Sequence, residues 1–244
     1  MSDVNLIVLT AAVFVIAVLY SSVGHAGASG YIAVMALLNL PASVIKPTAL
    51  MLNISVASIG AFQFWRAGHF QWRLFWPFAL LALPGALLGG YLNLPTQIFK
   101  WLLGVVLLLS AVRFLLRAPE ESEPVPPRVL TSLGAGALLG VLAGMTGTGG
   151  GVFLSPLMIW RRWAGTKTVA AVAAMFILVN SLAGLAGHLG KTGRLPAVAL
   201  PLLAAVILGG TLGSYFSCHR FSIAAIKRLL ATVLFSAGTK LLLS

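Results

Sequence analysis

Long apolar stretches follow one another along almost the whole chain, and this pattern constrains the fold more than any other feature. Stretches long enough to cross about 30 Å of hydrocarbon as an α-helix recur from the amino end to the carboxyl end. A membrane β-barrel would show short segments of alternating polarity instead. With 59% hydrophobic and 8% charged residues and a mean hydropathy of +1.02, the chain has more apolar surface than a soluble domain buries. The sequence therefore predicts an all-α, polytopic membrane protein.

The breaks between the apolar stretches predict ten helices in two halves. Their expected ranges are about 5–23, 30–44, 47–65, 72–92 and 97–116, then 129–146, 152–160, 167–189, 196–216 and 223–243. The second range and the seventh range are the two short helices. A polar, proline-rich stretch at 118–128 separates the halves. Residues 1–117 then form a first transmembrane repeat, 118–128 a linker, and 129–244 a second repeat.

Matched residues indicate that the two halves are duplicates. The matches are glycines 24, 27 and 30 with 144, 147 and 150, Lys46 with Lys167, Gly85, Gly89 and Tyr91 with Gly209, Gly213 and Tyr215, and Lys100, Leu102, Leu103 and Arg113 with Lys227, Leu229, Leu230 and Lys240. Their spacing grows steadily from 120 to 127 residues, as small insertions would make it. An ordered series of this kind favours duplication.

Basic residues give an orientation. If all ten helices cross, 11 lysines and arginines fall on one face and 5 on the other; if the short helices re-enter, the split is 8 to 8. The positive-inside rule favours the first arrangement, with two inverted repeats of five helices, both termini outside and a cytoplasmic linker. A helix over 152–160 spans only about 14 Å. The alternative is therefore that each short helix re-enters, and either way one short or broken helix belongs to each half.

The four acidic residues lie outside every apolar segment. They are Asp3, Glu120, Glu121 and Glu123. No intramembrane carboxylate is therefore present for coupling transport to protons or cations. The net charge of +12 comes from bases at segment ends, which is typical of contact with lipid headgroups of a cytoplasmic (cell inner) membrane rather than with nucleic acid. The single cysteine, Cys218, predicts no disulfide and no metal site, and no motif indicates a cofactor.

Two glycine-rich breaks are the candidate anion site. The second break, Met145–Gly151, falls between two apolar segments, and a fainter copy occurs at Gly27-Ala28-Ser29-Gly30. Backbone N–H groups at the start of a half-helix bind anions without a basic side chain. The alternative is that small residues only allow helices to pack closely. Three consecutive glycines exceed what packing needs, so we favour a site. Its candidate residues are Gly27, Ser29, Gly30, Thr146, Gly147, Thr148, Gly149, Gly150 and Gly151.

Five further side chains are candidates. Lys46 and Lys167 are matched cations that either attract the anion or extend to the membrane interface. Asn53 and Asn180 lie in the matched third helices of the two halves, where an amide either contacts the ligand or bonds across a helix interface. His25 adjoins the first break and is a possible proton carrier, although a lone histidine is more often only a hydrogen-bond donor.

Several motifs of the chain resemble those of a known family. The run Gly147–Gly151 followed by Val-Phe-Leu-Ser-Pro, the pair Lys167-Thr168 and the stretch 209–213 are similar to the sulfite exporter TauE/SafE family of membrane permeases. In the first half, Gly27–Gly30 departs from the richer glycine run of that family. The resemblance implies movement of a small sulfur-containing anion, such as sulfite, a sulfonate or thiosulfate, across the membrane by alternating access.

Two other functions stay open. A passive anion channel also fits the absence of a coupling carboxylate. A rhomboid-like intramembrane serine protease is suggested by Gly27-Ala28-Ser29-Gly30 with His188, and it requires Ser29 and His188 within hydrogen-bond reach. The counterpart of Ser29 in the second half is a glycine, so duplication argues against the protease and we expect no enzyme activity.

Overall fold

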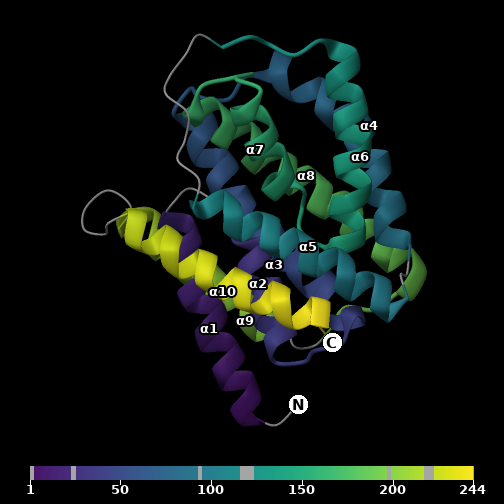
Figure 1. Cartoon of the computed structure of the whole chain (residues 1–244), viewed down its shortest axis with the longest axis vertical. Helices are drawn as coiled ribbons and strands as arrows, with labels where there is room; N and C mark the ends of the chain where they lie inside the picture. The colour runs from purple at the N-terminus through teal and green to yellow at the C-terminus, as the bar shows by residue number, and fades with distance from the viewer. Residues whose placement is uncertain are drawn as a thin grey trace.

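The computed structural model describes residues 3–22, 26–92, 95–115, 124–196, 199–216 and 223–243. Within these ranges the chain forms ten helices and no strand, which confirms the predicted all-α fold (Figure 1). The helices are α1 (Asp3–Ser22), α2 (Ala28–Leu37), α3 (Ala42–Arg66), α4 (Trp72–Tyr91), α5 (Thr96–Leu115), α6 (Val129–Thr146), α7 (Gly151–Trp160), α8 (Thr166–Thr192), α9 (Ala199–Phe216) and α10 (Ile223–Leu243).

The expected boundary between α2 and α3 is wrong. The sequence predicts a helix over about 30–44, but α2 ends at Leu37 because Asn39 adopts a left-handed conformation with φ 57°. The N–H group of Leu40 then bonds to the carbonyl oxygen of Met35, which closes the helix end. The next helix begins at Ala42, so Pro47 lies inside α3 rather than at its start.

Helix length and composition fit a multi-pass membrane protein. Among the described residues, four helices, α3, α4, α6 and α8, are each long and apolar enough to cross a membrane. The short helices α2 and α7 each have 10 residues, which is about 15 Å or half the hydrocarbon thickness. Large apolar side chains such as Leu130 and Leu138 on α6 are exposed, as they are on a surface that faces lipid.

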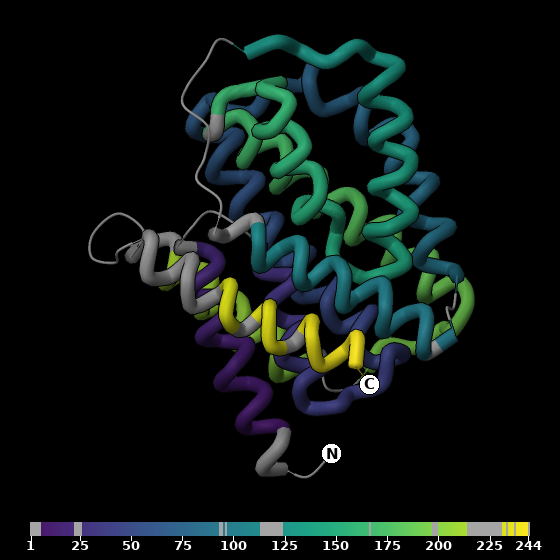
Figure 2. Tube along the Cα trace, viewed as in Figure 1, coloured from purple at the N-terminus to yellow at the C-terminus, as the bar shows by residue number. Residues whose placement is uncertain are grey.

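The helices form two bundles that exchange members between the halves. One bundle contains α6, α7 and α8 together with α4 from the first half (Figure 1). The other contains α1, α2 and α3 together with α9 from the second half. The fifth helices, α5 and α10, pack on each other and lie side by side across the second bundle (Figures 1 and 2). Each fourth helix therefore packs mainly on the other half.

Close glycine contacts give the relative directions of these helices. Helix α6 runs parallel to α4, and helix α9 runs parallel to α1. The third helices, α3 and α8, run antiparallel. Between α6 and α4, Gly136, Gly140 and Gly144 contact Phe78, Ala82 and Ala86, respectively. Between α9 and α1, Gly209 contacts Phe14 and Gly213 contacts Val18. Between α3 and α8, Gly60 contacts Ala174 and Gly184 contacts Leu50. An inverted duplication would give these directions, and the inverted relation of the complete halves stays a prediction.

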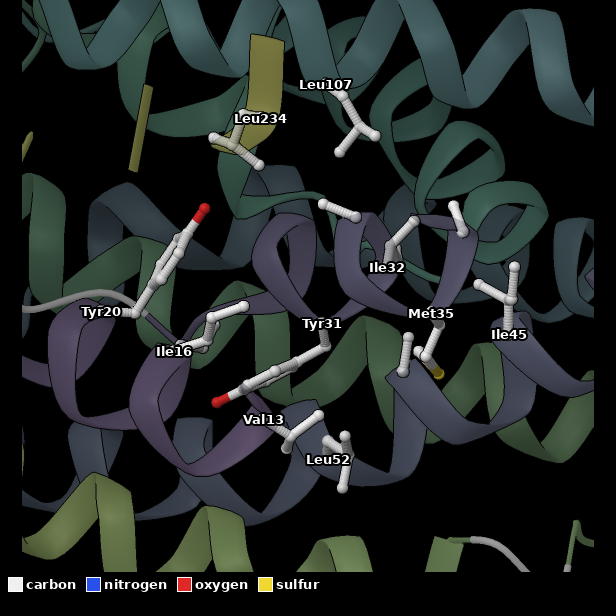
Figure 3. Close-up of a cluster of buried hydrophobic side chains, with 14 of the residues drawn as sticks. Val13, Ile16, Tyr20, Tyr31, Ile32, Met35, Ile45, Leu52, Leu107 and Leu234 are labelled. Carbon is white, nitrogen blue, oxygen red and sulfur yellow. The ribbon is translucent and has the colours of Figure 1, made fainter. Parts of the chain in front are cut away.

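Large side chains fill the centre of the α1–α2–α3–α9 bundle. Tyr31 of α2 is fully buried and points toward Val13 of α1 and Leu52 of α3 (Figure 3). Leu107 of α5 and Leu234 of α10 close the cluster on the opposite side of α2 (Figure 3). The short helix α2 is therefore enclosed by other helices along its length, and its position is set by packing rather than by lipid.

Candidate functional site

The second glycine-rich break connects α6 to α7 inside the protein. Helix α6 ends at Thr146, and α7 begins at Gly151 after a turn of four residues. In that turn Gly147, Gly149 and Gly150 have φ values of 79°, 70° and 81°. An L-amino acid with a side chain rarely adopts this left-handed conformation, so the glycines are what allows the chain to turn here. All residues from Thr146 to Gly151 are buried.

Backbone N–H groups of the break have no acceptor. In the part of the chain that the structure describes, the N–H groups of Gly149, Gly150 and Gly151 make no hydrogen bond. The first N–H groups of a helix have no partner within that helix. Because these residues are buried, water does not reach them as it would on a surface. Three buried donors at the positive end of a helix favour an acceptor, and an anion is the best one.

Two polar side chains from the crossing of α3 and α8 meet the break at Gly149. A β-carbon placed on Gly149 would lie 2.8 Å from Ser181 Oγ and 3.3 Å from Asn53 Nδ2. The same Asn53 Nδ2 donates a hydrogen bond of 3.2 Å to the carbonyl oxygen of Gly147. The structure therefore brings one predicted candidate, Asn53, to the predicted break, together with Ser181.

Buried polar atoms without a partner are concentrated on the helices around this crossing. Within the described ranges they are Tyr31 OH, Thr48 Oγ1, Asn53 Oδ1, both Nδ2 and Oδ1 of Asn180, Ser181 Oγ and His188 Nδ1. They belong to α2, α3 and α8. Buried polar groups normally have a hydrogen-bond partner, and a group of exceptions indicates a ligand or water position. From the sequence, Ser181 was considered together with Asn180 as a group that either contacts the ligand or bonds across a helix interface, whereas Tyr31 and Thr48 were not considered; the signal available for both was a hydroxyl inside an apolar span.

The hydroxyl groups predicted as donors are used within the protein. Thr146 donates to the carbonyl oxygen of Leu142 at 2.7 Å, and Thr148 lies 2.9 Å from Thr146 Oγ1. Since the Thr146 hydrogen goes to Leu142, Thr148 donates to Thr146, and neither hydroxyl retains a hydrogen for a ligand. These two residues hold the end of α6 closed rather than offering free donors.

The two matched lysines have different environments. Lys46 is 5% exposed, and its Nζ donates to the carbonyl oxygens of Gly89, Gly90 and Leu92 at 2.9, 2.7 and 2.9 Å. All three N–H bonds of the ammonium therefore go to the carboxyl end of α4. The backbone of Lys46 packs on the break, 2.9 Å from a β-carbon placed on Gly147. Lys167, in contrast, is exposed in the first turn of α8.

The first break is described only from Ala26 onward, so the matched glycine Gly24 and the candidate His25 lie outside the described residues. Gly27 has φ 89° and precedes α2, as Gly150 precedes α7. Ser29 Oγ lies 2.9 Å from the hydroxyl oxygen of Tyr20, and Gly30 packs on Tyr20. No hydrogen bond joins Ser29 to His188 in the described structure, so the pair that a serine protease needs is not formed.

The second break offers free hydrogen-bond donors in the described structure. They are the backbone N–H groups of Gly149, Gly150 and Gly151 and the Ser181 hydroxyl. Among the described residues the only acidic side chain is Asp3, in the first turn of α1. A site without carboxylates and with several donors suits a small anion better than a cation.

Comparison with known proteins agrees with this chemistry. The family model described as "Sulfite exporter TauE/SafE" matches residues 9–241. The chain belongs to the TauE/SafE family. Membership places it among multi-pass membrane transporters rather than enzymes, and it confirms the family resemblance seen in the sequence.

Two known proteins match this chain along nearly their whole length. "Probable membrane transporter protein y4hK" of Sinorhizobium fredii (strain NBRC 101917 / NGR234) is 39% identical over 245 residues, covering 98% of this chain and 99% of the relative. "Probable membrane transporter protein YjnA" of Bacillus subtilis (strain 168) is 27% identical over 239 residues, covering 90% and 92%. No solved structure matches the chain significantly.

Proposed function

We propose that this protein is a secondary transporter of small sulfur-containing anions of the sulfite, sulfonate or thiosulfate class. The observation that carries the proposal is the set of buried donors without acceptors at Gly149, namely the N–H groups of Gly149, Gly150 and Gly151 and the hydroxyl of Ser181. The family description, which names sulfite, supports a sulfur-containing anion as the substrate. The anion takes the place of the missing acceptors, between the end of α6 and the start of α7.

The surrounding contacts supply a way to couple binding to motion. Asn53 on α3 and Ser181 on α8 approach the break from two antiparallel helices. An anion that bonds to both helices and to the break stabilises one arrangement of the three elements over another, which is how a ligand shifts a conformational equilibrium. Alternating access then follows from rocking of the halves about this crossing.

Uptake into proteoliposomes tests this function. Purified protein is reconstituted, and uptake of radiolabelled sulfite and thiosulfate is measured with and without unlabelled anion inside the vesicles. A carrier gives saturable uptake that internal anion accelerates. Flux that rises linearly with the external anion concentration and does not depend on internal anion would show a passive channel instead. No flux of any sulfur anion would refute the substrate class. The Gly149→Val protein, reconstituted at the same density, is expected to be inactive.

A further inference from the structure

A pocket lined by two lysines lies away from the glycine breaks. It has a volume of about 270 Å³. Its walls come from the α2–α3 turn, the first two turns of α5 and the last turn of α10. The lining residues are Ala36, Asn39, Leu40, Pro41, Ala42, Ile45, Phe99, Lys100, Leu103, Lys240 and Leu241. None of them belongs to the second break, and within the described ranges none bonds to it, so the transport site does not account for this pocket.

Two lysines give the pocket its charge. Lys240 Nζ donates to the carbonyl oxygen of Leu37 at 2.8 Å and to Asn39 Oδ1 at 3.0 Å, which uses two of its three N–H bonds. Lys100 is half-buried, and no hydrogen bond or ion pair of Lys100 occurs in the described part of the chain. Among the described residues, no acidic side chain lines the pocket. A half-buried ammonium without a counter-charge favours an anionic ligand.

The floor of the pocket is apolar. Ile45, Phe99, Leu103 and Leu241 are each less than 9% exposed, whereas Asn39 at the rim is exposed. A small soluble anion would gain nothing from such a floor. A ligand with a charged head and a hydrocarbon body would use both the lysines and the apolar side chains.

The position of the pocket also points to a lipid. It lies where α2 ends, α3 and α5 begin and α10 ends, so four helix ends meet at one edge of the bundle. In a membrane protein the ends of apolar helices lie at the level of the headgroups, where lysines interact with anionic lipids. We propose that this pocket binds the phosphate of an anionic membrane phospholipid, with Lys100 and Lys240 as its cationic ligands and the apolar floor in contact with the start of an acyl chain.

Native mass spectrometry of the full-length protein in detergent tests the proposal. Bound lipid is counted during titration with dioleoylphosphatidylglycerol and, separately, with dioleoylphosphatidylcholine. We expect tighter binding of phosphatidylglycerol, and Lys100→Gln is expected to weaken it about fivefold, the effect of one basic residue near anionic lipid, while leaving phosphatidylcholine binding unchanged. The matched control Arg73→Gln removes a positive charge from an exposed position on α4 and should change neither.

Two further measurements keep the proposal open to refutation. Ala42→Phe fills the pocket without altering its charge and should also weaken phosphatidylglycerol binding. Glycerol 1-phosphate, a soluble form of the headgroup, should displace the lipid only at far higher concentration. Equal displacement by glycerol 1-phosphate would overturn the assignment to lipid, and wild-type binding in both Lys100→Gln and Ala42→Phe would overturn the site itself.

Discussion

Asn53 Nδ2 and the carbonyl oxygen of Gly147 are joined by a hydrogen bond of 3.2 Å. The bond links the third helix of the first half to the break in the second half. The backbone of Lys46, two turns earlier on α3, packs on the same glycine. Helix α3 therefore contacts Gly147 at two points, and a movement of α3 along α8 changes the shape of the turn that holds the free donors.

Removing the Ser181 hydroxyl separates a binding role from a structural one. In the described structure Ser181 Oγ is buried and has no partner, so Ser181→Ala loses no internal hydrogen bond. Stability should stay the same or rise by about 1 kcal/mol, because an unsatisfied buried group disappears. Transport should show a KM raised about tenfold, which corresponds to the loss of one good hydrogen bond. Uptake kinetics and thermal unfolding of the same preparation measure the two effects.

Ser110→Ala is the matched control for Ser181→Ala. Ser110 is also buried, but it donates to the carbonyl oxygen of Val106 at 2.7 Å on α5, away from the break. Its KM should stay at the wild-type value. If Ser181→Ala also leaves KM unchanged, Ser181 is not a ligand of the anion.

A methyl group at Gly149 should stop transport without stopping insertion. Gly149→Ala forces a side chain into a left-handed conformation and places its β-carbon 2.8 Å from Ser181 Oγ and from Ile177 Cγ2. We expect uptake to fall at least tenfold, since even small displacements of positioned groups weaken binding strongly. The control is Gly134→Ala on α6, where an added β-carbon meets nothing within 4 Å. Full activity of Gly149→Ala would mean that the anion binds elsewhere.

Replacing Lys46 should lower stability. Lys46→Met keeps the length of the side chain but removes three hydrogen bonds to the end of α4. We expect the free energy of unfolding to fall by about 2 kcal/mol, the range for hydrogen bonds to a charged group. Thermal unfolding in detergent measures the change, with Lys167→Met as the exposed control. A lower transport rate with unchanged stability would instead favour the alternative that Lys46 attracts the anion.

The glycines of α6 that face α4 should tolerate no branched side chain. A β-carbon on Gly140 would overlap the carbonyl oxygen of Ala82, and Gly136 and Gly144 have the same relation to Phe78 and Ala86. Gly140→Val is therefore expected to separate the two helices and to abolish the folded, monodisperse fraction in size-exclusion chromatography. Gly134→Val, on the open side of the same helix, should retain it.

Local patterns predicted much of this structure. Apolar runs bounded by Gly, Pro and charged residues placed most helices correctly, and α6 and α10 have the predicted ranges. The glycine run at 147–151 forms a buried break as expected. Such features depend on residues close together in the sequence. The end of α2 was missed because Asn39 adopts a left-handed conformation and Lys240, far away in the sequence, bonds to it and to Leu37.

Contacts between residues far apart in the sequence account for the other differences between the predicted and the observed roles of residues. The matched positions of Lys46 and Lys167 predicted similar roles, but only Lys46 lies beside the end of a packed helix. The starts of α3 and α8 are 124 residues apart, at Ala42 and Thr166, whereas the two lysines are 121 apart. The lysines therefore occupy different positions within their helices. Which hydroxyls lack a partner also depends on neighbouring helices, so Ser181 and Thr148 were indistinguishable in the sequence.

The exchange of fourth helices between the bundles has a consequence for biosynthesis. Helices α1, α2 and α3 enter the membrane first, but their bundle is completed by α9, which is translated more than 130 residues after the end of α3. Until then the surface of α1 that α9 will cover must be occupied by lipid or by a chaperone. The other bundle, in contrast, can assemble on α4 as soon as α6, α7 and α8 emerge from the ribosome. The α4–α6–α7–α8 bundle is thus expected to fold first. The bundle of the amino-terminal helices is expected to complete its packing only near the end of translation, when α9 has been made.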